Sequence, residues 1–285
     1  MKKNKVILFL LVTTLFLCSC GTTSTVPITG RKQHLLVSDE QVMSLSNEQY
    51  QSYMKTAKPS TNAANTAMVR RVGERLANAV ETYLRQHNLA SEVSNYKWEF
   101  NLVQDKQANA FCMPGGKIVV YEGLLPYTQN EASLAVVLGH EIAHAVAKHS
   151  AERMSQQMKA QYGAQALSLI LGGSSSATQE IAQQVYGLGA QYGVMLPYSR
   201  NNESEADYMG LIFAAMAGYD PNVAVSFWQR MSQAGSGTPE FMSDHPSDAS
   251  RIAAIQKEMP EALKYYKGNN SVRTINFSHK KSNRR

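Results

Sequence analysis

The stretch that decides the fold is EASLAVVLGHEIAHAVAKH, residues 131–149. Asn130, directly before it, is a favourable N-cap, and the apolar run Leu134–Leu138 predicts that this helix is buried in the core. Two of its histidines, His140 and His144, are four residues apart. Because four residues turn a helix by about 400°, both imidazoles project from one face toward a common point.

These two histidines and Glu141 form the motif HExxH, the signature of zinc metallopeptidases. In this motif the two imidazoles bind Zn²⁺, and the glutamate takes a proton from the water that attacks a peptide carbonyl. The alternative is a helix whose histidines only cap or pack. A catalytic zinc needs three protein ligands, so the interpretation requires one more ligand from another element.

The run ESEAD, residues 203–207, supplies the best candidates for the missing groups. Glu203 and Asp207 are four residues apart on a predicted helix and share a face, whereas Glu205 points about 200° away from Glu203. We expect Glu203 to be the third zinc ligand and Asp207 to accept a hydrogen bond from a ligand histidine. The alternative is a solvated acidic helix start, which the helix dipole favours.

Other polar residues are candidates for a donor to the oxyanion that forms during peptide hydrolysis. The best is His245, in the sequence Asp-His-Pro, and its alternative is a capping or surface histidine. Tyr198 and Arg251 are weaker candidates. His149 lies nine residues after His140, about 180° around a continuous helix, so we expect it to face away from the metal as a packed or surface residue.

A strand-turn-strand pattern lies before the motif helix. Residues 98–103 and 117–121 predict strands, and Pro114-Gly115-Gly116 predicts the turn into the second. Substrate peptides commonly pair with an exposed sheet edge, so we predict that Asn109 and Ala110 bind substrate. The alternative is an ordinary strand-turn-strand unit. We interpret Cys112 in this segment as a half-buried strand residue and not as a nucleophile.

The N-terminus predicts a lipoprotein signal peptide over residues 1–19. Three lysines precede the apolar run Val6–Leu17, which is shorter than the roughly 20 residues of a membrane-spanning helix. The sequence Leu-Cys-Ser-Cys, ending at Cys20, resembles the bacterial lipobox, which implies cleavage before Cys20 and lipidation of that residue. The alternative is an ordinary secretory signal. The mature chain would keep Cys112 as a free thiol and form no internal disulfide.

The remaining chain divides into three parts. Residues 20–60 are expected to be a lipid-anchored tether, with Thr, Pro and Gly over 21–33, and an N-terminal helix over 39–56. Residues 61–265 are expected to form the catalytic domain and 266–285 a basic tail. The weakly charged region 161–196 predicts two helices around a loop, either as part of the core or as a lid. Removing the signal lowers the formal charge from +6 to +3, and no nucleic-acid module is predicted.

Four segments together resemble the Ste-type gluzincin zinc metallopeptidases: HEIAH (140–144), ESEAD (203–207), NAFCMPGGKIVVYEGLL (109–125) and DHPSDASRI (244–252). This family includes HtpX, the CAAX prenyl endopeptidases and the mitochondrial Oma-type protease. The likeness, over roughly residues 25–260, is closest to soluble bacterial lipoproteins of the LoiP and BepA kind. It implies a zincin-type α+β fold that is predominantly helical, with a small sheet edging the cleft. It also implies one Zn²⁺ per chain and endopeptidase activity.

The resemblance also has implications for the substrates, the location and the regulation of the protein. It implies cleavage of misfolded or unassembled envelope proteins, with the chain lipid-anchored on the periplasmic side of the bacterial outer membrane. In BepA-like members a histidine matching His245 can occupy the open position of the metal and silence the enzyme. We expect no membrane span after the signal and, because about 40 residues follow His245, no helical-repeat domain of the BepA kind. A non-proteolytic, metal-stabilised periplasmic chaperone or binding lipoprotein is the alternative.

Overall fold

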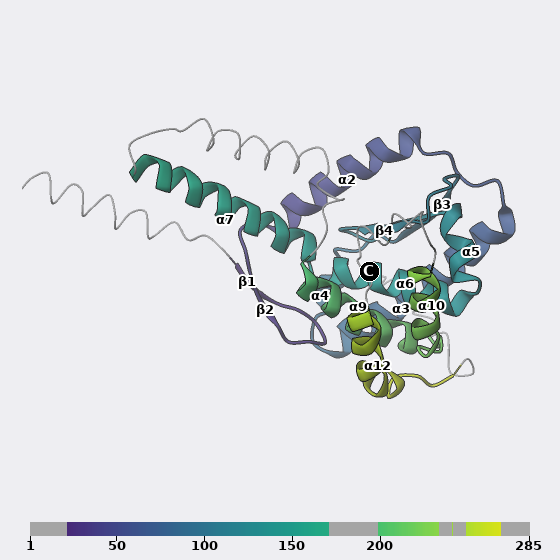
Figure 1. The fold of residues 1–285 in the computed structure, drawn as a ribbon. Helices are drawn as coiled ribbons and strands as arrows, with labels where there is room; N and C mark the ends of the chain where they lie inside the picture. The colour runs from purple at the N-terminus through teal and green to yellow at the C-terminus, as the bar shows by residue number, and fades with distance from the viewer. Residues whose placement is uncertain (1–21, 171–198, 234–240, 242–248, 269–285) are drawn as a thin grey trace, which may run out of the picture.

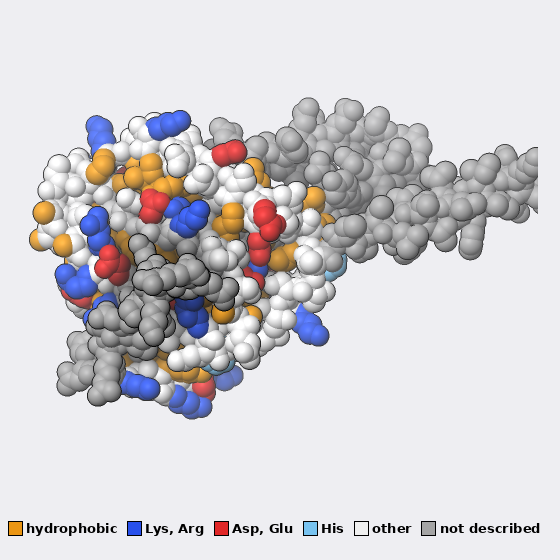
Figure 2. Space-filling view, turned by 180° about the vertical axis from the view of Figure 1, so that it is seen from behind, with side chains coloured by type: hydrophobic (Ala, Val, Ile, Leu, Met, Phe, Trp, Pro, Cys, Tyr) orange, Lys and Arg blue, Asp and Glu red, His pale blue; other side chains and the backbone are white. Residues whose placement is uncertain are grey.

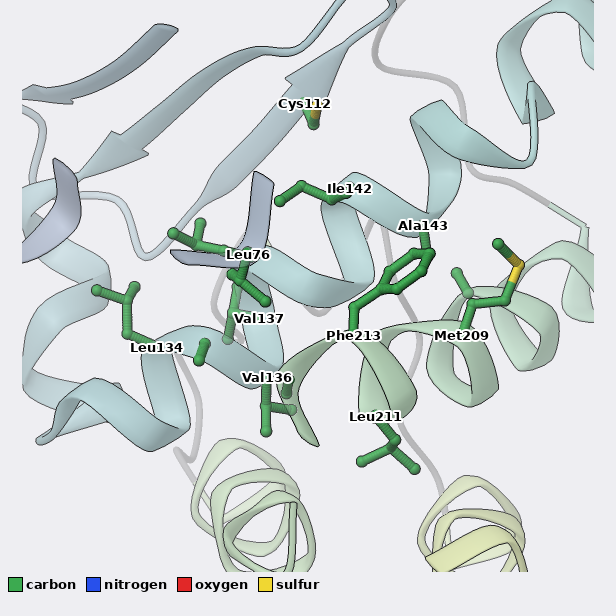
Figure 3. Packing of buried hydrophobic residues seen from close by; sticks show 14 of the residues in the cluster. Leu76, Cys112, Leu134, Val136, Val137, Ile142, Ala143, Met209, Leu211 and Phe213 are labelled. Atoms are coloured by element: carbon green, nitrogen blue, oxygen red, sulfur yellow. The ribbon is translucent and has the colours of Figure 1, made fainter. Parts of the chain in front are cut away.

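Helix α6 (Glu131–Val146) lies at the centre of the fold, as its apolar sequence predicts (Figures 1 and 3). In this computed structural model, residues 22–170, 199–233, 241 and 249–268 are described. Asn130 caps α6 by accepting a 2.8 Å hydrogen bond from the backbone N–H of Ser133. The helix ends earlier than predicted, because Lys148 adopts a left-handed φ of 54° and a separate helix begins at His149.

The chain is α+β and predominantly helical, as predicted. No described helix is long and apolar enough to cross a membrane. The remaining helical elements are α2 (Asp39–Thr56), α3 (Ala63–Gln86), α4 (Ala90–Val93), the 3₁₀ turn η1 (Glu122–Leu124), α5 (Leu125–Thr128), α7 (His149–Ile170), α9 (Arg200–Met216), α10 (Val223–Ser232) and α12 (Ala249–Leu263). The strands are β1 (Thr22–Thr25), β2 (Lys32–Leu35), β3 (Glu99–Val103), β4 (Ala110–Met113) and β5 (Lys117–Tyr121).

A three-stranded sheet of order β3-β5-β4 lies between α6 and α2 (Figure 1). Strand β5 runs parallel to β3 and antiparallel to β4, so β4 is an edge strand. Because side chains alternate along a strand, Cys112 packs with α6 in the main core while Phe111 packs with Tyr50 of α2. The predicted strands and the turn before β5 are confirmed, and Gly115 and Gly116 supply the positive φ angles that the turn requires.

Helix α2 forms over the predicted residues 39–56, and Ser38 is its N-cap. Leu45 is 45% exposed, and the helix buries Val42, Ser46 and Tyr50. Polar contacts select this face: the Ser46 hydroxyl donates to the carbonyl of Pro114, and the Tyr50 hydroxyl donates to Glu99. Helix α3 has an apolar face on which these residues are buried: Val69, Val72, Leu76, Val80 and Leu84.

The predicted tether over residues 21–33 is wrong for the described residues, which form a β-hairpin of β1 and β2. Val26 at its turn is buried in the main core, and Leu35 packs near Ala151 of α7. The Gln33 side chain donates a 2.6 Å hydrogen bond to the carbonyl of Ala147, just after α6 ends. A short polar hairpin is not stable alone, so these contacts with α6 and α7 explain why it folds.

The surface of the described part carries both signs of charge. Figure 2 shows acidic and basic side chains interspersed over the face opposite to that of Figure 1. Part of the predicted 161–196 unit is the end of α7, which reaches Ile170. Residues 171–196, the signal peptide and most of the basic tail lie outside the described residues.

Candidate metal centre

Helices α6 and α9 cross with their backbones almost in contact. A Cβ built on Gly139 would lie 2.7 Å from the carbonyl oxygen of Gly210, and one built on Gly210 would lie 2.7 Å from the amide nitrogen of His140. Side chains of both helices fill the space around the crossing, as Figure 3 shows for Ala143 and Phe213. The crossing places the carboxylates at the start of α9 beside the two motif histidines.

The structure brings together the three residues predicted as metal ligands, and all three are buried. The Nε2 atoms of His140 and His144 are 3.1 Å apart. The carboxylate oxygens of Glu203 lie 3.4 Å from Nε2 of His140 and 3.3 Å from Nε2 of His144. A tetrahedral zinc with bonds of about 2.0–2.1 Å separates its ligand atoms by about 3.3 Å, so this donor set fits the ion.

The second ring nitrogen of His140 is held by Asp207, as predicted. Nδ1 of His140 lies 2.9 Å from Oδ1 of Asp207, and because a carboxylate can only accept, the ring proton is on Nδ1. The Nε2 lone pair therefore faces the metal position. Arg251 donates one 2.7 Å hydrogen bond to each oxygen of Asp207, and its guanidinium lies 3.7 Å from the centre of the Trp228 ring. Burial raises the pKa of Asp207, but Arg251 and His140 lower it overall.

Arg251, considered above as a weaker oxyanion donor, is therefore engaged elsewhere. Besides its two bonds to Asp207, its Nη1 lies 3.6 Å from Oε2 of Glu203. The residue is buried. Its position indicates that it holds the carboxylates behind the metal position.

The second ring nitrogen of His144 is held by His149, which was predicted to face away. The two Nδ1 atoms are 2.9 Å apart, and Nε2 of His149 lies 2.9 Å from Oε2 of Glu205. The prediction assumed one continuous helix, and the break at Lys148 turns His149 back toward the site. Neither Gly nor Pro marks this break, so no local signal predicts it.

The partners of His149 define how its protons are arranged. Burial lowers the pKa of His149, which favours the neutral ring. Its Nε2–H then donates to Glu205, and its Nδ1 accepts from Nδ1–H of His144. This arrangement leaves the Nε2 lone pair of His144 directed at the metal position, as in His140.

Glu205 points away from the ligand cluster, as predicted, but it meets the N-terminal hairpin. It accepts from Nε of Arg31 at 2.8 Å and from the hydroxyl of Thr29 at 2.6 Å. Arg31 also donates to both oxygens of Glu152 on α7, at 2.7 and 2.8 Å. Burial raises the pKa of Glu205, but the hydrogen bonds from His149, Arg31 and Thr29 lower it to about 2. The predicted tether thus contributes directly to the polar contacts around the metal centre.

Glu141 is buried on α6, on the side of strand β4. Burial, followed by the nearby charge of Glu141, raises the pKa of the Cys112 thiol. Asn109 and Ala110 lie at the start of this edge strand and are themselves buried. The backbone N–H of Phe241 donates to the carbonyl of Ala108 at 3.1 Å, directly before them.

Three of the residues singled out from the sequence lie outside the described residues: Cys20, Tyr198 and His245.

Comparison with known proteins agrees with this arrangement. The sequence profile of peptidase family M48 matches residues 45–259. The chain is 39% identical over 186 residues to mitochondrial metalloendopeptidase OMA1 of Schizosaccharomyces pombe, covering 64% of this chain and 53% of that protein. It is 32% identical over 245 residues to the mitochondrial metalloendopeptidase OMA1 of Homo sapiens, covering 84% of this chain and 46% of that protein.

A bacterial relative is also similar. The chain is 32% identical over 174 residues to a putative beta-barrel assembly-enhancing protease of Vibrio cholerae, covering 58% of this chain and 36% of that protein. The chain thus spans about half, or less, of the length of these three relatives. The family match confirms the resemblance drawn from the four sequence segments. The chain belongs to peptidase family M48.

Proposed function

We propose that the chain is a zinc-dependent endopeptidase with His140, His144 and Glu203 as the metal ligands. The observation that carries the proposal is the convergence of two Nε2 lone pairs and one carboxylate at spacings of 3.1–3.4 Å. Bound there, Zn²⁺ would supply a Lewis acid that lowers the pKa of water and polarises a carbonyl. The names of the OMA1 relatives, which are metalloendopeptidases, support this activity.

Glu141 is the general base in this proposal. It follows His140 on the same helix and lies toward the edge strand, where a substrate peptide would pass. It takes a proton from the attacking water and later passes it to the leaving amine. Asp207 and Arg251 keep His140 in the orientation that ligation requires.

The substrate is proposed to pair with the side of β4 that faces away from β5, at Asn109 and Ala110. An edge strand offers unpaired backbone groups, and its distance from the motif helix is small because β4 packs on α6. The backbone contact between Phe241 and Ala108 uses part of this edge, so a bound peptide begins beyond it or replaces it.

The proposed substrates are misfolded or unassembled envelope proteins. Two observations support this class: the lipobox-like sequence before Cys20 and the similarity to proteins named beta-barrel assembly-enhancing proteases. We place the chain on the periplasmic side of the outer membrane, anchored by lipid on Cys20. Gly21 and Thr22 follow that cysteine, and neither resembles the aspartate that retains lipoproteins at the inner membrane.

His245 is proposed to act at the open coordination position. Replacement by alanine separates its two candidate roles, because His245→Ala raises proteolysis if the histidine silences the metal. It lowers proteolysis if the histidine donates to the oxyanion. Full-length wild type and the variant would be compared on one unfolded protein substrate, with zinc content measured in both.

The decisive test of the proposed function compares wild type with Glu141→Gln. Zinc content is measured for both, together with cleavage of an unfolded protein, and chelator-treated wild type serves as the control. We expect equal zinc content and a loss of cleavage in the variant, because the amide cannot act as a base. Bound zinc with equal cleavage in both would overturn the enzymatic function and favour a non-proteolytic chaperone or binding lipoprotein.

A further inference from the structure

Each of the two ligand histidines is connected to an arginine through a series of hydrogen-bonded side chains. Arg251 contacts Asp207, which holds His140. On the other side, Arg31 contacts Glu205, and Glu205 holds His149, which in turn holds His144. We call each of these hydrogen-bonded series of side chains a relay. The residues of the first relay lie on helices of the domain, whereas the second relay begins in the N-terminal hairpin.

We propose that Arg31 is a positioning residue for the metal ligand His144, acting through Glu205 and His149. The β1–β2 hairpin is then part of the metal centre. This inference rests on the proposed zinc site.

The contacts of Arg31 explain why this position needs an arginine. Its Nε donates to Glu205, while Nη1 and Nη2 each donate to Glu152. The planar guanidinium can bind two carboxylates at once, which a lysine ammonium cannot do with defined geometry. Arg31 thereby fixes the position of Glu205 relative to α7, the helix that begins with His149.

The burial of the relay explains why a distant group can control the ligand. His149 is fully buried and Glu205 is nearly so. Without Arg31, Glu205 keeps Thr29 and His149 as hydrogen-bond partners but loses the guanidinium that pairs with its carboxylate. A buried carboxylate that loses its counter-charge shifts toward water, and this movement weakens its hold on His149. His144 then loses the acceptor that directs its Nε2 at the metal.

A purely structural role of Arg31 leads to a different prediction. Arg31 also joins the hairpin to α7 through Glu152, so its loss could only loosen the hairpin. Val26 tests this possibility, because its side chain anchors the same hairpin in the main core, while its hydrogen bond to the Arg31 carbonyl comes from the backbone N–H, which an alanine keeps. Val26→Ala therefore loosens the hairpin and leaves the relay intact.

The experiment measures the metal itself in the full chain. Zinc affinity is determined by competition with a chromogenic chelator, and ligand geometry by the visible absorption of the Co²⁺-substituted protein. Thermal unfolding of the metal-free protein reports stability. The variants are Arg31→Gln, Thr29→Val as a milder change that removes one hydrogen bond to Glu205, and Val26→Ala as the control.

We expect Arg31→Gln to lower zinc affinity on the order of tenfold and to change the Co²⁺ spectrum, as loss of groups behind metal ligands does. Thr29→Val should act in the same direction more weakly, and it keeps the inference testable if Arg31→Gln does not fold. Val26→Ala should lower the unfolding temperature without changing affinity or spectrum. In a His149→Ala background, Arg31→Gln should have no further effect on zinc affinity.

Two results would overturn the inference. In the first, wild-type protein binds zinc, and the Arg31 and Thr29 variants keep the wild-type affinity and spectrum. Arg31 then has only a structural role, and the proposed function still stands. Wild-type protein that binds no zinc removes the proposed metal site and this inference with it.

Discussion

Gly139 of α6 and Gly210 of α9 face each other where the two helices cross. The amide nitrogen of His140 lies 2.7 Å from the position that a Cβ of Gly210 would occupy. Such backbone proximity is possible only without side chains on either residue. The short distance between the motif helix and the carboxylates of α9 therefore depends on glycine at both positions.

Gly210→Ala should separate α6 from α9. We expect it to lower the free energy of unfolding by about 1–3 kcal/mol, as overpacking does, and to reduce zinc retention after dialysis. Gly73→Ala is a matched control, since the nearest atoms to an added Cβ there belong to the side chain of Phe100 on strand β3 and not to another backbone. The control should lose stability but retain zinc; equal zinc retention in Gly210→Ala would contradict the role of the crossing.

Asp207→Asn removes the charge that orients His140 and takes from the buried Arg251 the carboxylate that binds it most closely, leaving the more distant Glu203. We expect zinc affinity to fall by about tenfold to a hundredfold, measured by chelator competition. Asp220→Asn is a suitable control because, among the described residues, the Asp220 side chain bonds its neighbour Asn222 and lies outside the metal centre. An Asp207 variant with wild-type affinity would show that Arg251 and Asp207 serve stability alone.

The hydrogen bonds of Glu205 predict a pH dependence of stability. Its pKa is lowered to about 2 from the ordinary 4.5, so its contribution is complete above pH 4.5 and is lost as the pH falls toward about 2. We expect the stability difference between wild type and Glu205→Gln to be largest above pH 4.5 and to shrink below it. Urea unfolding of the metal-free proteins at several pH values measures this. A difference that is constant with pH would argue against an ionised Glu205.

Cys112 should be unreactive in the folded protein. The thiol is buried in strand β4, and burial raises its pKa well above the ordinary value, so the reactive thiolate is scarce at neutral pH. Maleimide should label a variant with both Cys18→Ser and Cys20→Ser, in which Cys112 is the remaining cysteine, only after denaturation in urea. Rapid labelling of the folded variant would indicate that β4 detaches from α6.

Cys20→Ser tests the proposed anchor directly. Wild type expressed in a bacterium with a clickable fatty acid should incorporate the label and sediment with membranes, whereas the variant should do neither. Cys18→Ser is the control, since that residue would leave with the signal peptide. Equal labelling of wild type and the Cys20 variant would exclude lipidation at this position.

The spacing within HEIAH and within ESEAD is enough to predict which side chains meet, because helical geometry fixes residues four apart on one face. The alternation before α6 likewise predicts β3 and β5. Other features depend on long-range contacts. Lys148 ends α6 in a left-handed conformation that only its surroundings make favourable, which moves His149 into the site.

The hairpin is the clearest case of this limit. Its sequence is rich in Thr, Pro and Gly, which by local propensity describes a linker. It folds because Val26 enters the core and Arg31 meets carboxylates more than 100 positions away in the chain. The buried face of α2 likewise depends on long-range contacts, since its Ser46 and Tyr50 bond Pro114 and Glu99.

The position of the hairpin has a further consequence for the proposed lipid anchor. Strand β1 begins at Thr22, and its hairpin is packed into the body of the domain. If the lipid is on Cys20, only Gly21 separates the anchor from folded structure, and one residue spans no more than about 3.6 Å. The catalytic domain would then lie against the lipid headgroups, with almost no flexible linker between them. An enzyme held in this way would move along the membrane by lateral diffusion. It would reach only polypeptides that come within the height of one domain from the membrane surface.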